Sequence, residues 1–410
     1  MAAQSGRRGM KMKLIRVMLA GCASGLLVLA GCGTESGTSS RVEDTGAGDS
    51  TETDVGSGSG DTVETDSGSG DTVETDAGSG DTVEADADAG DTATSDGSGD
   101  GSDDTTGVEP PHPIGISDFT VFFGRDRTVR LYVPASAPRS PRALVVVLHG
   151  GGGEGLGVSE LGGHPLAEFR TVADREGIVI AYPEGSTARD GRLGWTDCRS
   201  DNLQASTDDD AGFLQTVVET LAVDYDLPAE RRFMAGGSNG GQMTLAYAAV
   251  AAETLGGIAT SNANLPEAPR PGRCTDGPVR PTATLLVHGG ADTVMPFEGG
   301  CVANFGGNCA RGSVIGAEAT RDAFLLLNGL PNTPTTSLTV EVDPDDAGTA
   351  ERFVYAGPTP VAWWRMNGAG HPIASRAIQT ATTAAAGAQN RDIEFAEIAW
   401  SFFAAQLPTP

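Results

Sequence analysis

Short apolar runs alternate with amphipathic segments along the chain from about residue 113 onward. Five short, mostly apolar runs have the length of strands: 143–148, 178–181, 232–235, 283–287 and 361–364. Five other segments repeat apolar residues with helical spacing: 165–175, 210–224, 241–253, 316–327 and 391–404. Because runs without polar alternation suit strands buried on both faces, this order predicts an α/β fold with a mostly parallel central sheet and helices on both faces.

Two segments of alternating polar and apolar residues precede these runs, at 119–123 and 129–133. The residues between them, Gly124-Arg125-Asp126-Arg127, suit a tight turn. The two segments therefore predict an antiparallel hairpin at the N-terminal edge of the sheet.

The first 31 residues have the pattern of a secretory signal, with a basic start followed by an apolar run at 17–30. The run ends in Leu29-Ala30-Gly31-Cys32, which resembles a bacterial lipobox and predicts a lipid on Cys32. A second copy ends at Cys22, but the apolar run before it is too short for a signal. An ordinary signal cut elsewhere, or a single membrane anchor, is the alternative.

Residues 32–112 are rich in Gly, Ser, Thr, Asp and Glu and almost lack large apolar side chains. The sequence Asp-Thr-Val-Glu-Thr-Asp starts at Asp61 and Asp71, and a degenerate copy at Asp81 completes a ten-residue repeat. Such a segment cannot bury enough apolar surface to fold, so we expect a disordered acidic tether before a catalytic domain at 113–410. Most of the net charge of −28 lies in this tether, and an acidic chain argues against nucleic acid as a partner.

A serine stands in a Gly-rich turn between the apolar run 232–235 and a helical segment. The turn, Gly236-Gly237-Ser238-Asn239-Gly240, matches the Gly-x-Ser-x-Gly nucleophile elbow in its required strand-to-helix context. We expect Ser238 to be a catalytic nucleophile, and the alternative is a passive serine in a tight turn.

In this arrangement an acid and then a histidine follow the serine along the chain. Of the five histidines, His371 is the one that follows a plausible downstream acid, and it stands in a loop after the run 361–364. Asp292 follows a buried strand and a short glycine turn, so we expect Asp292 to orient His371 as the general base. The reserve acids are Asp276, Glu298 and Asp322.

The other histidines have different expected places. His149 and His288 each precede glycine at the end of a strand, and we expect them to be structural with satisfied ring nitrogens. His164 is expected to be a solvated loop residue.

Glycines follow His149 directly, in Gly150-Gly151-Gly152-Gly153, and resemble the oxyanion loop of lipases and esterases. We expect the backbone N–H groups of Gly151 and Asn239 to stabilise the oxyanion. Gly150, Gly152 and Gly155 also fit a dinucleotide motif, but no helix pattern starts at the last glycine, as that motif requires.

Four cysteines follow Cys32, an even number in a chain predicted to be exported, and this suggests two disulfides. Three connectivities are possible. The short separation of Cys301 and Cys309 favours that pair and leaves Cys198 with Cys274. The spacing does not suit a zinc site.

Several motifs together resemble the polyhydroxybutyrate depolymerase and feruloyl esterase group of α/β-hydrolases. They are the His149 glycine run, 173–184, 209–214, Ser238-Asn-Gly-Gly-Gln-Met243 and 288–297. The resemblance covers nearly all of 119–405 and implies a Ser238–His371–Asp292 triad, an acyl-enzyme and no metal or organic cofactor. Two departures stand out: the group's frequent Trp-Pro does not follow His371, and 301–309 looks like an insertion near the cleft.

The sequence as a whole therefore predicts an exported, lipid-anchored serine carboxylesterase, with the membrane and an ester substrate as partners and a monomeric state. Feruloyl or acetyl esters of plant polysaccharide are the expected substrates, and a polyester is the runner-up. A serine peptidase on the same scaffold usually needs a further domain, and a catalytically idle binding module would be expected to lose a triad residue.

Overall fold

The computed structural model describes residues 109–203, 205–270, 274, 280–302 and 309–409. The predicted signal, the lipid on Cys32, nearly all of the tether and the reserve acid Asp276 lie outside these residues. No helix in the described part of the chain is both long and apolar enough to span a membrane.

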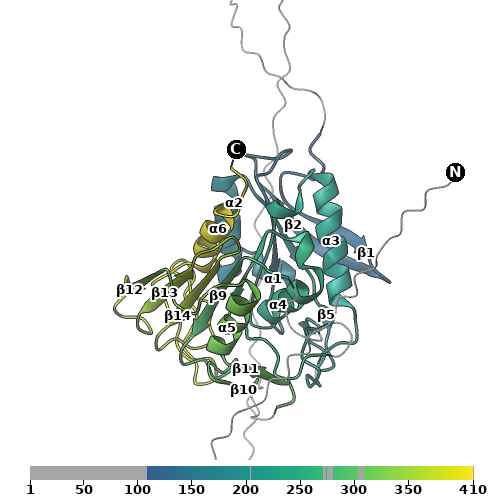
Figure 1. The fold of residues 1–410 in the computed structure, drawn as a ribbon. Helices are drawn as coiled ribbons and strands as arrows, with labels where there is room; N and C mark the ends of the chain where they lie inside the picture. The colour runs from purple at the N-terminus through teal and green to yellow at the C-terminus, as the bar shows by residue number, and fades with distance from the viewer. Residues whose placement is uncertain (1–108, 204, 271–273, 275–279, 303–308, 410) are drawn as a thin grey trace, which may run out of the picture. The chain divides into compact units, whose positions relative to one another are not determined.

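A ten-stranded sheet forms the centre of the described domain, in the order β1-β2-β4-β3-β7-β8-β9-β14-β13-β12 (Figure 1). Its strands are β1 (Gly115–Phe122), β2 (Asp126–Val133), β3 (Leu144–Leu148), β4 (Val179–Pro183), β7 (Arg232–Gly237), β8 (Gly257–Ser261), β9 (Thr284–Gly289), β12 (Thr336–Val340), β13 (Ala350–Tyr355) and β14 (Val361–Met366). The six strands from β4 to β14 in this order are parallel, and the two strands at each end are antiparallel.

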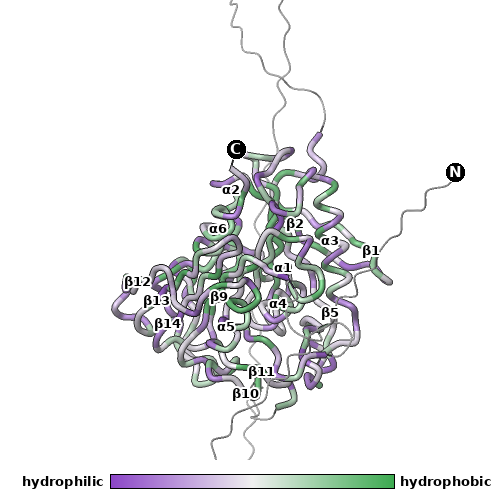
Figure 2. Tube along the Cα trace, viewed as in Figure 1, coloured by the Kyte–Doolittle hydropathy of each residue, from purple (hydrophilic) through white to green (hydrophobic). Residues whose placement is uncertain are grey.

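Helices cover both faces of the sheet (Figure 1). They are α1 (Gly155–Val158), α2 (Phe169–Glu176), α3 (Asp210–Asp224), α4 (Asn239–Ala251), α5 (Ala317–Leu327) and α6 (Phe395–Ala404). Side chains of α3, α4 and α5 pack in one hydrophobic cluster with Val146, whereas those of α2 and α6 pack in a second cluster with Val145. Neighbouring residues of β3 thus point into opposite cores, which explains the uninterrupted apolar run. In Figure 2 the apolar segments coincide with the central strands and the helices packed on them.

This architecture confirms the predicted fold class. The chain has an α/β-hydrolase fold, with a mostly parallel sheet, helices on both faces and a strand-to-helix turn that carries Ser238. The predicted hairpin is also present, since β1 pairs with β2 across the turn that follows Phe122.

Three strands of the main sheet were missed from the sequence pattern. β8 consists mostly of small residues and lacks a long apolar run. β12 and β13 lie at the edge of the sheet, where β12 is largely exposed and its residues are mainly Thr and Ser. Edge strands with an open face carry little of the apolar signal on which the prediction relied.

The last helix begins at Phe395, four residues later than the pattern indicated. The residues just before it are not helical, and two of them bond to a neighbouring loop. Asp392 Oδ1 accepts hydrogen bonds from the backbone N–H of Val342 and Asp343, and Arg391 bonds to Asp343. The predicted helix at 165–175 likewise starts as a 3-10 turn, Pro165–Glu168, before α2.

Candidate active site

Ser238 occupies the sharp turn between β7 and α4. Its backbone has φ 54° and ψ −122°, a conformation that L residues rarely adopt and that is typical of functional sites. The turn needs a glycine at Gly240, because a Cβ there would collide with the carbonyl oxygens of Leu148 and His149. The backbone N–H of Ser238 donates to the Ser261 carbonyl oxygen at the end of β8, 2.9 Å away. The turn is therefore pressed against β3 and tied to β8.

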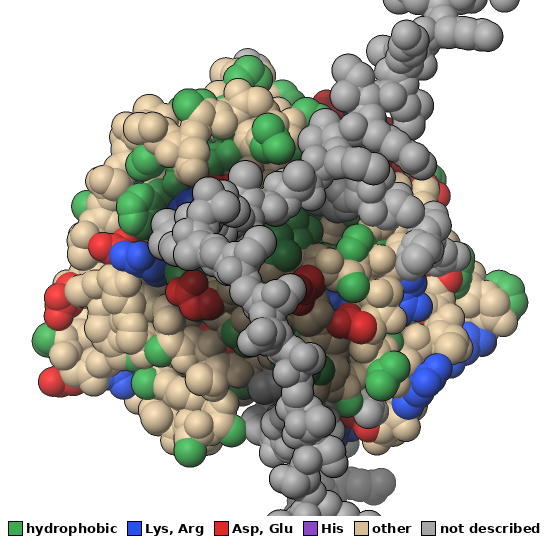
Figure 3. Space-filling view, turned by 60° about the horizontal axis from the view of Figure 1, so that its bottom comes forward, with side chains coloured by type: hydrophobic (Ala, Val, Ile, Leu, Met, Phe, Trp, Pro, Cys, Tyr) green, Lys and Arg blue, Asp and Glu red, His purple; other side chains and the backbone are tan. Residues whose placement is uncertain are grey.

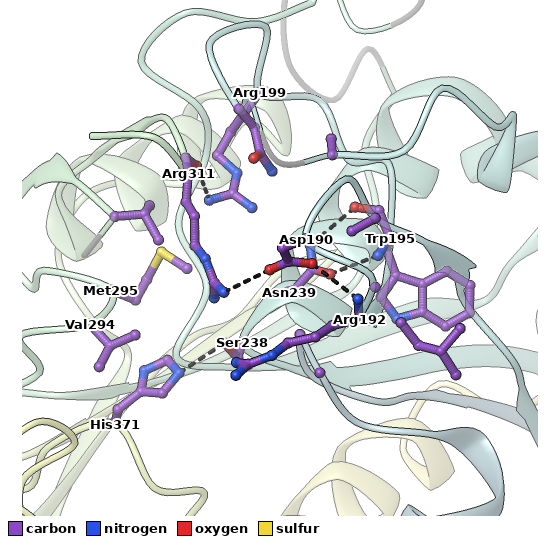
Figure 4. Close-up of a pocket in the computed structure, with 18 residues that line it drawn as sticks. Asp190, Arg192, Trp195, Arg199, Ser238, Asn239, Val294, Met295, Arg311 and His371 are labelled. Carbon is purple, nitrogen blue, oxygen red and sulfur yellow. Dashed lines mark hydrogen bonds and ion pairs between the residues drawn. The ribbon is translucent and has the colours of Figure 1, made fainter. Parts of the chain in front are cut away.

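The three side chains of the predicted triad lie in one hydrogen-bonded row. His371 Nδ1 is 2.7 Å from Asp292 Oδ2, and His371 Nε2 is 2.8 Å from Ser238 Oγ. A carboxylate can only accept, so Nδ1 carries the proton and the Ser238 hydroxyl donates to Nε2. Figure 4 shows the contact between Ser238 and His371 at the floor of the pocket.

Asp292 is fixed by the turn that follows β9. Its Oδ1 accepts hydrogen bonds from the backbone N–H groups of Val294 and Met295, both at 2.8 Å, which leaves Oδ2 for His371. The side chain of Asp292 is 2% exposed, so water competes little for this contact. The reserve acids Glu298 and Asp322 are not hydrogen-bonded to His371, and Asp322 bonds to Arg321 instead.

Asn262 supports the loop of His371, and the sequence analysis missed it. Its backbone has φ 52°, directly after β8. Its Nδ2 donates to the His371 carbonyl oxygen at 2.7 Å, and its Oδ1 accepts from the backbone N–H of Gly289 at 2.8 Å. Asn262 thus joins the ends of three segments that carry the site. A strand prediction for β8 would have placed this asparagine at the same sheet edge as Ser238.

The two predicted oxyanion donors lie side by side. A Cβ on Gly151 would be 3.5 Å from Asn239 Cβ, and one on Gly150 would be 3.5 Å from Ser238 Cβ. No backbone hydrogen bond between described residues uses the N–H of Gly151 or Asn239. Both groups are therefore available to an oxygen bound next to Ser238.

The side chain of Asn239 holds the wall of the pocket. Its Oδ1 accepts from the Trp195 backbone N–H at 2.7 Å, and its Nδ2 donates to the Trp195 carbonyl and to Asp197 Oδ2. Asp197 in turn forms a buried ion pair with Arg199 at 2.6 Å. These bonds fix the backbone of Asn239, and hence the direction of its N–H group.

Two other histidines near the site, His149 and His288, have structural roles. His149 is fully buried, donates from Nδ1 to the Gly150 carbonyl and accepts at Nε2 from the Gly185 N–H. His288 donates from Nε2 to the Ala263 carbonyl and accepts at Nδ1 from the Trp363 indole. Burial lowers the pKa of each to about 4, so both are neutral at pH 7.

The expectation for His164 was wrong. Its Nδ1 accepts a hydrogen bond from the backbone N–H of Leu166 and caps the 3-10 turn before α2. Burial lowers the pKa of His164 to about 4. The residue is therefore a partly buried cap and not a solvated loop residue.

Two disulfides lie close to the pocket wall. Cys198, which stands between Asp197 and Arg199 in the sequence, forms a disulfide with Cys274. Cys301 forms a second disulfide with Cys309. These are the pairs that the cysteine spacing favoured. Cys301 ends β10 (Gly299–Cys301), which pairs with β11 (Ser313–Ile315).

The pocket above Ser238 is lined by both apolar and charged side chains (Figure 4). Val294, Met295 and Val302 form an apolar side. The charged lining residues are Asp190, Arg192, Arg199 and Arg311. Within the described residues, no group of three or more His, Cys, Asp or Glu side chains is arranged to hold a metal ion.

Comparison with known proteins identifies the family. No protein-family model matches the chain. NocK of Nocardia uniformis subsp. tsuyamanensis, named as an esterase, is 32% identical over 182 residues, which are 44% of this chain and 49% of that protein. A protein of Oryza sativa subsp. japonica named as a carboxylesterase is 30% identical over 186 residues, and the match covers 42% of this chain and 68% of the rice protein. The chain belongs to the carboxylesterase family.

A third relative is the bifunctional acetylxylan esterase/xylanase XynS20E of Neocallimastix patriciarum. It is 26% identical over 185 residues, which are 45% of this chain and 24% of that protein. The matched region thus spans about half of NocK and about a quarter of XynS20E.

Proposed function

We propose that this chain is an exported serine carboxylesterase that cleaves feruloyl or acetyl esters of plant polysaccharides. The observation that carries the proposal is the hydrogen-bonded row from Ser238 through His371 to Asp292, with Ser238 at a positive φ. Beside it lie two backbone N–H groups that no backbone hydrogen bond between described residues uses. A serine, a histidine and a buried carboxylate in this order are what nucleophilic acyl transfer requires.

The mechanism follows from the positions of these groups. Ser238 Oγ attacks the ester carbonyl carbon while its proton passes to His371 Nε2. The carbonyl oxygen becomes an oxyanion that accepts hydrogen bonds from the N–H groups of Gly151 and Asn239. His371 then gives the proton to the departing alcohol, and an acyl-enzyme remains on Ser238. Water, activated by His371, hydrolyses this acyl-enzyme and restores the hydroxyl.

Asp292 stabilises the histidine when it is positively charged. The carboxylate also holds the ring with Nε2 toward Ser238, because Nδ1–H is committed to Oδ2. With Oδ1 bound to two backbone N–H groups, Asp292 cannot turn away from His371.

The substrate class is supported by the relatives and by the pocket. One relative is named as an acetylxylan esterase, and the sequence motifs resemble the polyhydroxybutyrate depolymerase and feruloyl esterase group. The arginines and the aspartate of the pocket lining suit a hydroxyl-rich alcohol better than the plain aliphatic chain of a polyester.

The location of the enzyme is part of the proposal. A signal pattern precedes Cys32, and the two disulfides suit an oxidising compartment outside the cytosol. A lipid on Cys32 would attach the domain to a membrane through the acidic tether.

The experiment is a comparison of acetylated xylan, methyl ferulate, para-nitrophenyl acetate and polyhydroxybutyrate as substrates of the purified protein. We expect turnover of at least one of the first three, and Ser238→Ala to lower kcat by about 10⁶, as in known triads. Ser136→Ala, a surface serine remote from the triad, is the matched control. Turnover of polyhydroxybutyrate alone would reject the substrate class, and retention of activity by Ser238→Ala within about tenfold would reject the mechanism.

A further inference from the structure

The charges that line the pocket beside Ser238 do not cancel. Arg199 is neutralised by Asp197, with which it forms a buried ion pair. The Oδ2 atom of Asp190 lies 3.4 Å from Nη2 of Arg311. Arg192 is left as the excess positive charge of the pocket lining.

Asp190 does not neutralise Arg192 either, although it is two residues away. Its Oδ1 accepts a hydrogen bond from the backbone N–H of Arg192 at 3.1 Å, and its Oδ2 faces Arg311. Among the described residues, no side chain or carbonyl is hydrogen-bonded or ion-paired to the guanidinium of Arg192. The donors of this guanidinium are therefore free for a ligand.

The segment that carries Arg192 is held firmly against the oxyanion loop. Arg192 precedes β6 (Leu193–Gly194), which pairs with β5 (Ser186–Thr187). The Leu193 carbonyl accepts a hydrogen bond from the Gly152 N–H at 2.7 Å. The Ser186 hydroxyl donates to the buried carboxylate of Asp210 at 2.9 Å. The backbone of Arg192 is thus placed before a substrate arrives, which lowers the entropy lost on binding.

The side chain of Arg192 reaches into the pocket. Its Cδ lies 3.5 Å from where a Cβ on Gly152 would be, so its stem follows the oxyanion loop. Figure 4 shows the side chain extending across the pocket toward Ser238 and His371. The pocket lies at the end of the domain that carries β10 and β11, since Val302 and Arg311 line it, and acidic and basic side chains are interspersed on this end (Figure 3).

We propose that Arg192 binds a carboxylate on the substrate, and that the enzyme prefers esters with a carboxylate near the scissile bond, such as acylated sugar-acid units of a polysaccharide. A guanidinium matches a carboxylate with two parallel, charge-assisted hydrogen bonds, whereas the hydroxyls of a neutral sugar accept hydrogen bonds without the charge. The proposal rests on the esterase function and adds its substrate class.

Two pairs of aryl esters test this inference. In the first, the acyl part carries the carboxylate: para-nitrophenyl hemisuccinate against its methyl ester. In the second, the alcohol part carries it: para-acetoxybenzoate against its methyl ester. For at least one pair, we expect kcat/KM of the wild type to favour the carboxylate by about 10- to 100-fold. The pair that shows this preference tells which side of the ester faces Arg192.

Arg192→Gln should reduce this preference to near unity, mainly through a higher KM. Arg189→Gln is the matched control, because it removes the same charge from the same loop and Arg189 does not line the pocket. Added salt should weaken the wild-type preference. Equal rates within both pairs, or a preference that survives in Arg192→Gln, would overturn the inference. If neither member of any pair is hydrolysed, the esterase function itself fails and the inference fails with it.

Discussion

Asp292 differs from the other carboxylates near the site in its hydrogen-bond partners. Its Oδ1 is occupied by two backbone N–H groups, and its Oδ2 faces His371. Asp322, by contrast, lies on α5 and bonds to Arg321. Position at the end of a parallel strand, and not the residue type, distinguishes the two.

Asp292→Asn is therefore expected to lower kcat by about 10⁴, as the corresponding change does in a chymotrypsin-like triad. The fold should persist, because the remaining amide oxygen can still accept from Val294 and Met295. Steady-state kinetics and circular dichroism check the two statements. Asp322→Asn is the matched control, and equal losses in both variants would show that the effect is not specific to the triad.

The three residues of the proposed triad were easier to single out from the sequence than the residues that support them. Ser238, Asp292 and His371 each follow a strand pattern in a recognisable motif, and the structure brings them together. Asn262 was missed because β8 lacks an apolar run, so its place at the sheet edge was not visible. Arg192 follows no motif, and its free guanidinium is defined by contacts that only the folded chain has.

The turn between β7 and α4 is the element on which the site depends. The glycines of this turn let α4 start directly after Ser238 and lie close to β3. A Cβ on Gly240 would collide with the Leu148 and His149 carbonyl oxygens, and neither backbone group can move without disturbing the oxyanion loop.

Gly240→Ala is expected to destabilise the domain by about 1–3 kcal/mol and to lower activity, because the overpacked turn must shift. Gly157→Ala is the matched control, since a Cβ on Gly157 meets nothing within 4 Å. Its effect on stability should stay within about 0.5 kcal/mol. Denaturant unfolding measures both. A Gly240→Ala protein as stable and active as the control would show that the turn tolerates a side chain.

Two buried histidines make the stability of the whole domain depend on pH. His149 and His288 each place an acceptor nitrogen against an N–H donor, so protonation breaks a hydrogen bond inside the protein. Burial lowers the pKa of both from 6.5 to about 4. The unfolded chain therefore binds protons that the folded chain does not bind between these two pH values.

The free energy of unfolding should thus be highest above pH 6.5 and fall as the pH drops toward 4, by about 3 kcal/mol for each histidine. Glu394 acts in the opposite direction, because burial raises its pKa and protonation favours the folded state. Urea unfolding at several pH values between 7.5 and 4.5 measures the slope. His288→Gln should reduce this slope but not abolish it, because the pKa values of His149 and His164 are also lowered to about 4. A free energy that does not change over this range would contradict the neutral, buried state of the two histidines.

At the scale of the whole molecule, the sequence predicted the central sheet better than its edges. Strands buried on both faces have a clear apolar signal, whereas polar residues interrupt the apolar ones in β12 and β13, which were not predicted. The signal, the lipid on Cys32 and the tether stay predictions from the sequence pattern.

The most direct test of the central claim is the identity of the residue that becomes covalently modified. We predict that a fluorophosphonate inactivates the enzyme and that peptide mass spectrometry finds the adduct on Ser238. His371→Ala should slow this labelling strongly, because the hydroxyl loses the base that accepts its proton. An adduct on a different residue, or ester hydrolysis that continues at the full rate after Ser238 is labelled, would contradict the proposed mechanism.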